Sequence, residues 1–156
     1  MMNGLDWAFL PLQRYFDFQG RSGRAEYWWF TLMQMGLSLV TRIIDDLLDL
    51  GKGGAPISSN MLLAFALFSP SLAVAVRRLH DMNRSGWAIF SYVGMYLAVI
   101  IGGLILSMIF SAFGLVLMVL GLIGVTGGYI FLMASEGNRG DNNYGPSPYG
   151  YSYTSR

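Results

Sequence analysis

Two long stretches of the chain carry no charged residue. One runs from Gly53 to Val76, and the other runs from Ser85 to Ser135, a length of 51 residues. As one straight helix the second stretch would be about 76 Å long at 1.5 Å per residue, whereas the hydrocarbon core of a bilayer is about 30 Å thick. We therefore expect two membrane-spanning helices there, joined by a tight hairpin within 107–113.

Another apolar run, which opens with Tyr27, Trp28 and Trp29, predicts a further spanning helix near the start of the chain. The expected spans are about 27–44, 57–76, 87–107 and 114–135. Pro70 should kink the second of them, and a short polar connection at 77–86 should follow it. The predicted fold class is an all-α membrane protein, a four-transmembrane-helix bundle that forms a single membrane domain over 1–135.

The two ends of the chain differ from these spans. Residues 5–18 mix aromatic and charged side chains, which is typical of a segment that lies in the headgroup layer; a disordered leader is the alternative. Asp6 and Pro11 interrupt the apolar run that a cleavable signal peptide would need. Residues 136–156 are rich in Gly, Asn, Pro, Ser and Tyr, and we expect a polar tail that is mobile at its end.

Charged residues follow span one. Arg42 lies three and four residues before Asp45 and Asp46, which is pairing distance on a helix. With Asp49, these two form an acidic face opposite an apolar one. The pattern predicts that the helix leaves the membrane and continues along its surface until Gly51.

The composition agrees with a membrane protein. Apolar residues make up 54% of the chain and charged residues 12%, against roughly 25% charged in globular proteins. The net charge of +1 argues against general binding to nucleic acid. Cysteine is absent from the sequence, which excludes disulfides and thiolate metal sites. We expect no cofactor and no metal site.

The basic residues predict the orientation in the membrane. Eight lie before span one, between spans two and three, or after span four, and two, Arg42 and Lys52, lie in the other connections. The positive-inside rule then places both termini and the central loop in the cytoplasm. The expected location is the bacterial inner (plasma) membrane, with several passes.

Two polar segments on this cytoplasmic side are rich in functional groups. They contain Arg21, Arg24, Glu26, Arg77, Arg78, His80, Asp81 and Arg84. Guanidinium groups can hold carboxylates through paired hydrogen bonds, which would tie the start of span one to the loop between spans two and three. Five arginines face two carboxylates, so surplus positive charge could also hold anionic lipid headgroups.

The same segments resemble the bacterial membrane family called domain of unknown function 805. The resemblance lies in Gly-Arg-x-x-Arg-x-Glu-Tyr-Trp at 20–28, Arg-Arg-Leu-His-Asp-x-x-Arg-Ser-Gly-Trp at 77–87, and Asn-Tyr-Gly-Pro at 143–146. It covers nearly the whole chain except the tyrosine-rich end after Pro148. The resemblance implies a small polytopic protein of the inner membrane and no established activity.

Several of these residues have a catalytic and a structural interpretation. His80, the single histidine, could serve a metal or act as a base, but the sequence favours a role in the polar network of its loop. Glu26 and Asp81 beside arginines are more typical of paired structural groups than of catalytic acids. Ser85 is expected to cap span three. Trp28, Trp29 and Trp87 are expected to anchor the protein at the membrane interface.

Small residues recur in the last span. Gly114, Gly121 and Gly128 are spaced by seven residues, and Gly124 lies four before Gly128. Such residues let helix backbones approach closely within a membrane. Packing within one chain and packing between two copies both fit this spacing.

Three functions fit these observations. The leading hypothesis is a non-enzymatic membrane protein whose cytoplasmic arginines latch the helices together and contact anionic lipid or a partner. A small transporter or channel subunit is the first alternative, with support from Pro70 and Gln34 only. A membrane enzyme acting on lipid headgroups is the second. The expected partners are anionic membrane lipids, and a homo-oligomer or an unidentified membrane partner stays open.

Overall fold

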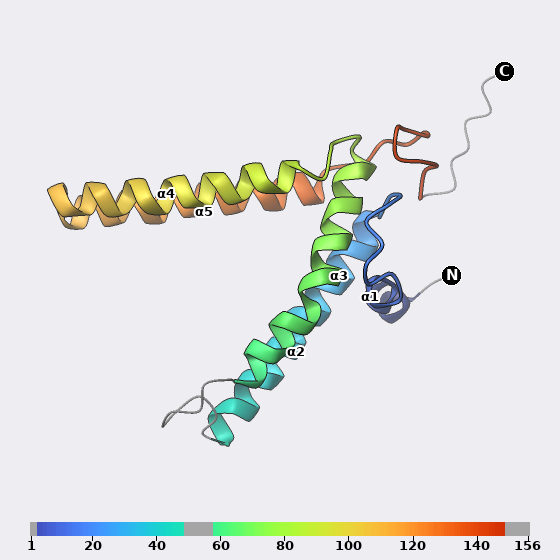
Figure 1. The fold of residues 1–156 in the computed structure, drawn as a ribbon, viewed down its shortest axis with the longest axis horizontal. Helices are drawn as coiled ribbons and strands as arrows, with labels where there is room; N and C mark the ends of the chain where they lie inside the picture. Colours follow the sequence, from blue (N-terminus) through green and yellow to red (C-terminus); the bar gives the residue numbers. More distant parts are fainter. Residues whose placement is uncertain (1–2, 49–57, 149–156) are drawn as a thin grey trace.

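The fold is built from α-helices alone in the residues that the structure describes. The computed structural model describes residues 3–48 and 58–148, and its helices are α1 (Gly4–Gln13), α2 (Arg24–Leu47), α3 (Ser59–Asp81), α4 (Ala88–Phe110) and α5 (Ala112–Ala134) (Figure 1). The all-α prediction is confirmed for this part of the chain. The extension expected after residue 44 is helical to Leu47, and its last residues, 49–51, lie outside the described residues, as does the first residue of span two.

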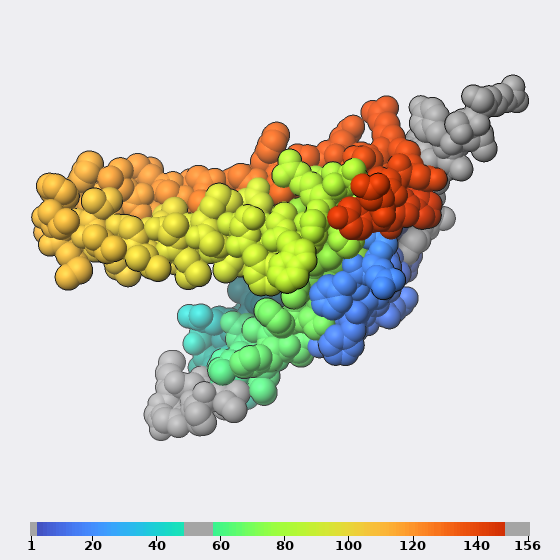
Figure 2. All heavy atoms as spheres, turned by 45° about the horizontal axis from the view of Figure 1, so that its top comes forward, coloured from blue at the N-terminus to red at the C-terminus, as the bar shows by residue number. Residues whose placement is uncertain are grey.

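The long helices form two antiparallel hairpins that share one base. Helices α2 and α3 make the first hairpin, α4 and α5 make the second, and the two diverge from the base in a V (Figure 1). Helix α1 lies beside α2 and α3 near this base. The segment after α5 returns to the same base, next to the N-terminal segment (Figure 2).

Three helices are long and apolar enough to cross a membrane, and these are α3, α4 and α5, each of 23 residues. They correspond to the second, third and fourth expected spans. Helix α2, at the place of the first, has charged residues near both ends and polar side chains between them. Most large apolar side chains of α4 and α5 are exposed, as in a helix that is hydrophobic all round and lies in lipid.

The polar connection expected at 77–86 is shorter than predicted, because α3 continues to Asp81. Arg78 and His80 in its last turn favour this extension, since they interact well with the negative end of the helix dipole. Asn83 then ends the helix with a φ of 56°, a left-handed conformation that asparagine tolerates better than most residues. The first part of the motif at 77–87, up to Asp81, is therefore helical.

The α4–α5 hairpin turns on a single residue, Ser111, within the range expected for it. Helix α5 begins at Ala112, two residues before the expected start. A Cβ on Gly114 would overlap the backbone of Ser107, so glycine is required for this close approach.

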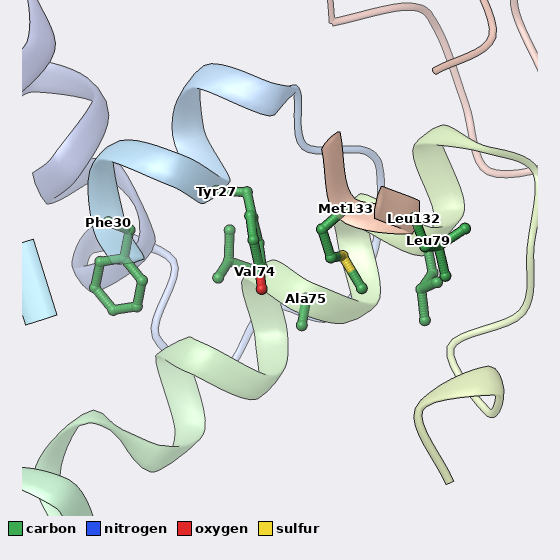
Figure 3. Close-up of a cluster of buried hydrophobic side chains, with 7 residues drawn as sticks. All are labelled: Tyr27, Phe30, Val74, Ala75, Leu79, Leu132 and Met133. Atoms are coloured by element: carbon green, nitrogen blue, oxygen red, sulfur yellow. The ribbon is translucent and has the colours of Figure 1, made fainter. Parts of the chain in front are cut away.

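The small hydrophobic core lies at the base of the V (Figure 3). It joins Tyr27 and Phe30 of α2, Val74 and Leu79 of α3, and Met133 of α5. The core therefore packs both hairpins together at the level where the polar motifs lie.

Candidate functional site

The two consecutive arginines at the end of α3 are fully buried. Arg77 and Arg78 are both 0% exposed. Successive residues of a helix point about 100° apart, so these side chains contact different parts of the molecule. Arg77 contacts the N-terminal segment and α2, and Arg78 contacts the end of α5.

Arg77 connects α3 to the segment before α2. Its Nη2 lies 2.8 Å from Oε1 of Glu26, which is itself buried. Its Nε donates to Oγ of Ser22 at 2.8 Å, and its Nη1 donates to the carbonyl oxygen of Asp17. The backbone N–H of Ser22 donates in return to the carbonyl oxygen of Arg77 at 3.1 Å. This arginine therefore fixes the entry of the chain into α2.

Arg78 connects α3 to the end of α5. Its Nε donates to the carbonyl oxygen of Met133 at 3.0 Å, and its Nη2 donates to that of Ser135. The last carbonyl groups of a helix have no partner within the helix, so a guanidinium is well suited to them. Its Nη1 donates to Oδ2 of Asp81, one turn further along α3.

Asp81 holds a second guanidinium, that of Arg21. Nε and Nη2 of Arg21 lie 3.0 and 2.8 Å from Oδ1 of Asp81, whose side chain is completely buried. Arg21 also donates to three carbonyl groups of the segment after α5, those of Asn138, Gly140 and Gly145. One carboxylate thus links the start of the chain, the end of α3 and the C-terminal segment.

We call Arg21, Glu26, Arg77, Arg78 and Asp81 the buried cluster. It contains three guanidinium groups and two carboxylates, and backbone carbonyl groups and the hydroxyl of Ser22 accept further hydrogen bonds from the guanidinium groups. Among the described residues no buried side-chain nitrogen or oxygen lacks a hydrogen-bond partner. A buried charge is costly unless it is paired and hydrogen-bonded, and this cluster meets both conditions.

The first part of the C-terminal segment packs against the end of α3. The N–H of Asn138 donates to the carbonyl oxygen of Asp81 at 2.8 Å, and Nδ2 of Asn142 donates to that of His80 at 2.8 Å. The rings of His80 and Tyr144 stack with centroids 3.8 Å apart. Sequence reasoning missed this docking; the Asn-Tyr-Gly-Pro motif was its one visible signal. The expected mobile end of the tail, 149–156, lies outside the described residues.

The other predicted cytoplasmic residues lie around the buried cluster. Arg24 is about half exposed and lies 3.8 Å from Glu136, while Arg84 is exposed. His80 is partly buried, with Nδ1 3.1 Å from the carbonyl oxygen of Gly20. Of the predicted anchors, Trp28 is partly buried against the core, and Trp29 and Trp87 are 45% and 76% exposed.

The N-terminal segment carries its own ion pair at the edge of this site. Nη2 of Arg14 lies 2.8 Å from Oδ2 of Asp17. This hydrogen bond from Arg14, together with one from the backbone of Gln19, holds the pKa of the Asp17 carboxyl below its usual range. The pair stabilises the turn whose Asp17 carbonyl oxygen accepts from Arg77.

Two expected contacts of polar residues are not found. Asp45 accepts from the N–H groups of Ser59 and Asn60 at 2.8 and 3.2 Å, and in the described residues it forms no ion pair with Arg42. The free N–H groups at the start of α3 attract a carboxylate more directly than an exposed guanidinium does. Ser85 does not cap α4, because the N-cap of this helix is Trp87. The Oγ of Ser85 instead accepts from the N–H of Trp87 at 3.3 Å.

The predicted packing glycines of α5 divide into two groups. A Cβ on Gly114 or Gly121 would collide with α4, so these residues lie in the hairpin interface. Gly124 and Gly128 have nothing within 4 Å of a Cβ position. Within the described chain no group of three His, Cys, Asp or Glu side chains could hold a metal ion.

Comparisons with known proteins agree with the motifs at this site. The family model described as a protein of unknown function (DUF805) matches residues 15–146. The inner membrane protein YhaI of Escherichia coli K12 is 34% identical over 145 residues, which are 92% of this chain and 96% of YhaI. The inner membrane protein YhaH of the same strain is 28% identical over 144 residues, 92% of this chain and 97% of YhaH. No solved structure matches the chain.

Proposed function

The chain belongs to the DUF805 family, and from this premise we propose that it is a non-enzymatic protein of the bacterial inner membrane whose buried cluster latches two helical hairpins together at the cytoplasmic face. One observation carries the proposal. Arg77 and Arg78 are completely buried, and they bind the two parts of the molecule that flank α3.

The proposal includes four membrane spans, with α2 as the first. Helix α2 packs along α3 as an antiparallel partner, and its 24 residues correspond to about 36 Å. If α3 crosses the bilayer, its neighbour α2 crosses it too. Four spans put both termini on one side, and the excess of arginine at the base of the V makes that side the cytoplasm.

The same geometry limits which arginines can contact lipid. Arg21, Arg77 and Arg78 are buried with their partners, so they are not available to headgroups. Arg24 is about half exposed, and Arg84 is exposed at the same end of the molecule. Such residues contribute about 1 kcal/mol each near an anionic leaflet. We therefore assign the contact with the phosphate groups of membrane lipids to the arginines around the buried cluster.

The latch is tested by Asp81→Asn. This change leaves the guanidinium groups of Arg21 and Arg78 without their shared carboxylate, and breaking a buried ion pair in this way costs about 3–5 kcal/mol. We expect a clearly lower unfolding temperature in detergent than for the natural chain. Asp141→Asn is the matched control, because Asp141 is exposed outside the cluster. Equal unfolding temperatures for the two variants would contradict the latch.

The orientation is tested by single cysteines, which the natural sequence lacks. Ser85→Cys and Ser147→Cys should react with a membrane-impermeant maleimide only after the inner membrane is opened. Ser58→Cys and Ser111→Cys, at the far ends of the hairpins, should react in intact spheroplasts. Labelling of Ser85 and Ser111 from the same side would rule out the proposed arrangement.

Transport is a second candidate, and one feature of α2 favours it. A largely apolar groove of about 490 Å³ opens along this helix between Thr31 and Arg42, and the polar side chains of Gln34 and Ser38 also line it. Polar side chains at membrane depth often line the path of a substrate. Ion flux in proteoliposomes that is abolished by Gln34→Leu would support this candidate, and absence of any flux would count against it.

A further inference from the structure

A pocket outside the buried cluster combines polar and apolar walls. It has a volume of about 380 Å³ and lies between the loop after α3, the start of α4 and the end of α5. Arg84, Glu136 and Asn138 line it on the side of the polar motifs, and Tyr92, Phe131 and Leu132 line it on the side of the hairpin. A molecule that fills this pocket would need a polar end and an apolar end.

The two charged residues of the pocket, Arg84 and Glu136, can each form a further hydrogen bond or ion pair. Arg84 is exposed, and its guanidinium has no hydrogen bond or ion pair within the described part of the chain. Glu136 is 65% exposed and lies 3.8 Å from Arg24 and 3.5 Å from Arg139. Exposed ion pairs at such distances are weak. The positively charged Arg84 and the negatively charged Glu136 are therefore both able to bind a ligand.

The apolar side of the pocket continues along α5. Gly128 lines the pocket, and Gly124 lies one turn further into the hairpin on the same face. Both have open space where a side chain would be, although α4 packs against Gly121 of the same helix. Because glycine has no side chain, the surface of α5 has open space at these two positions, and we call this space the furrow.

We propose that this pocket binds one phospholipid whose headgroup carries both a phosphate and a primary ammonium group, as in phosphatidylethanolamine. Arg84 holds the phosphate, Glu136 accepts from the ammonium group, and an acyl chain lies in the furrow at Gly128 and Gly124. The charges of the pocket cancel, which matches a zwitterionic headgroup better than an anionic one. The inference rests on the proposed function only in placing this end of the hairpin at the membrane boundary.

The headgroup contacts are tested by titrating the purified full chain in detergent with phosphatidylethanolamine or phosphatidylglycerol and counting bound lipid by native mass spectrometry. The natural chain should bind phosphatidylethanolamine more tightly. Arg84→Gln should weaken binding of both lipids about tenfold, since a charge-assisted hydrogen bond to phosphate is lost. Glu136→Gln should remove the preference between the two lipids.

Arg139→Gln is the matched control, because Arg139 is exposed in the same segment and does not line the pocket. It should leave both affinities within about twofold of the natural values. Equal losses for Arg84→Gln and Arg139→Gln would overturn the proposal, since they would indicate only general attraction of lipid to basic residues. A natural chain that binds phosphatidylglycerol equally or more tightly would overturn it too.

The acyl-chain furrow is tested by Gly128→Leu, which fills it. Binding of phosphatidylethanolamine should fall several-fold, whereas Gly127→Leu, on another face of the same helix, should have no such effect. Equal binding of phosphatidylethanolamine by the two leucine variants would refute the placement of the acyl chain in the furrow. These outcomes are separate from the latch, because Arg84, Glu136 and Gly128 lie outside the buried cluster and the latch is measured by the unfolding temperature.

Discussion

The buried cluster shows how much depends on single residues in this small protein. Arg77 and Arg78 are adjacent in sequence, yet one binds Glu26 and the other binds Asp81 and the end of α5. The helical rotation between neighbours separates their roles. Replacing Arg77 would therefore remove the guanidinium that binds Glu26. Replacing Arg78 would leave Asp81 with Arg21 and would remove the donor to the carbonyl groups at the end of α5.

A single methyl group added at Gly137 should destabilise the folded protein. A Cβ at this position would overlap the carboxylate of Asp81, whereas Gly140 has nothing within 4 Å. We expect Gly137→Ala to lower the free energy of unfolding by about 1–3 kcal/mol, the usual cost of overpacking. Gly140→Ala is the control and should change it little. Thermal unfolding in detergent would measure both, and equal stability would contradict the close approach of this segment.

The sequence could predict which charged residues form the buried cluster. It could predict only in part which arginine pairs with which carboxylate. The positive-inside rule and the two motifs placed Arg21, Arg78 and Asp81 at one boundary. Which guanidinium binds which carboxylate depends on where α3 ends, and that end lies beyond the residue expected. The carbonyl groups that Arg21 binds belong to a polar segment, and composition alone does not predict where such a segment docks.

Among the elements, the α4–α5 hairpin relies on close backbone approach. Its outer faces are apolar and exposed, so packing between the two helices depends on the few small residues in their interface. One polar contact, between the hydroxyl groups of Tyr96 and Thr126 at 2.9 Å, adds to this packing. The hairpin is thus specified by shape rather than by polarity.

Two adjacent glycines of α4 test this conclusion. A Cβ on Gly103 would overlap Met118 of α5, while Gly102 faces open space. Gly103→Ala should destabilise the hairpin, and Gly102→Ala should be neutral or stabilise it by up to about 1 kcal/mol through helix propensity. Unfolding temperatures of the two variants in the same detergent would compare them. If Gly103→Ala is as stable as Gly102→Ala, the hairpin does not depend on this contact.

The existence of α3, α4 and α5 was predictable, because charge-free runs of this length leave few alternatives in a bilayer. Helix α2 was predictable from the apolar run that opens with Tyr27, Trp28 and Trp29. The residues at which the helices end were harder to predict. Asn83 and Ser111 set two of them through unusual backbone conformations, which apolar periodicity does not indicate. The role of Asp45 as a cap for α3 was also hidden, because it depends on a residue of the next helix.

For the whole molecule, the base of the V is where all parts meet. Helix α1 contacts α2 and α3 there, the C-terminal segment binds Arg21 and the end of α3, and the hairpins separate beyond it (Figures 1 and 2). The core and the buried cluster therefore join the two hairpins in the described part of the chain.

Deletions of the C-terminal segment should reveal this dependence. Removing 136–156 takes away three carbonyl acceptors of Arg21, and a buried donor without a partner costs about 1–3 kcal/mol. We expect a lower unfolding temperature and faster proteolysis than for the full chain. Removing only 149–156 leaves all these acceptors in place and should have little effect. Equal stability of the two shortened chains would show that the segment does not support the cluster.

The participation of residues 138–145 in the cluster also has a consequence for biosynthesis. A chain emerges from the ribosome N-terminus first, so α2, α3 and Arg21 are made before the carbonyl groups that complete the guanidinium's hydrogen bonds. Until residues 138–145 have been made, the guanidinium of Arg21 cannot complete its hydrogen bonds. The native contacts between the two hairpins and the C-terminal segment are therefore completed only after all five helices have been synthesised, which makes them a late step of assembly.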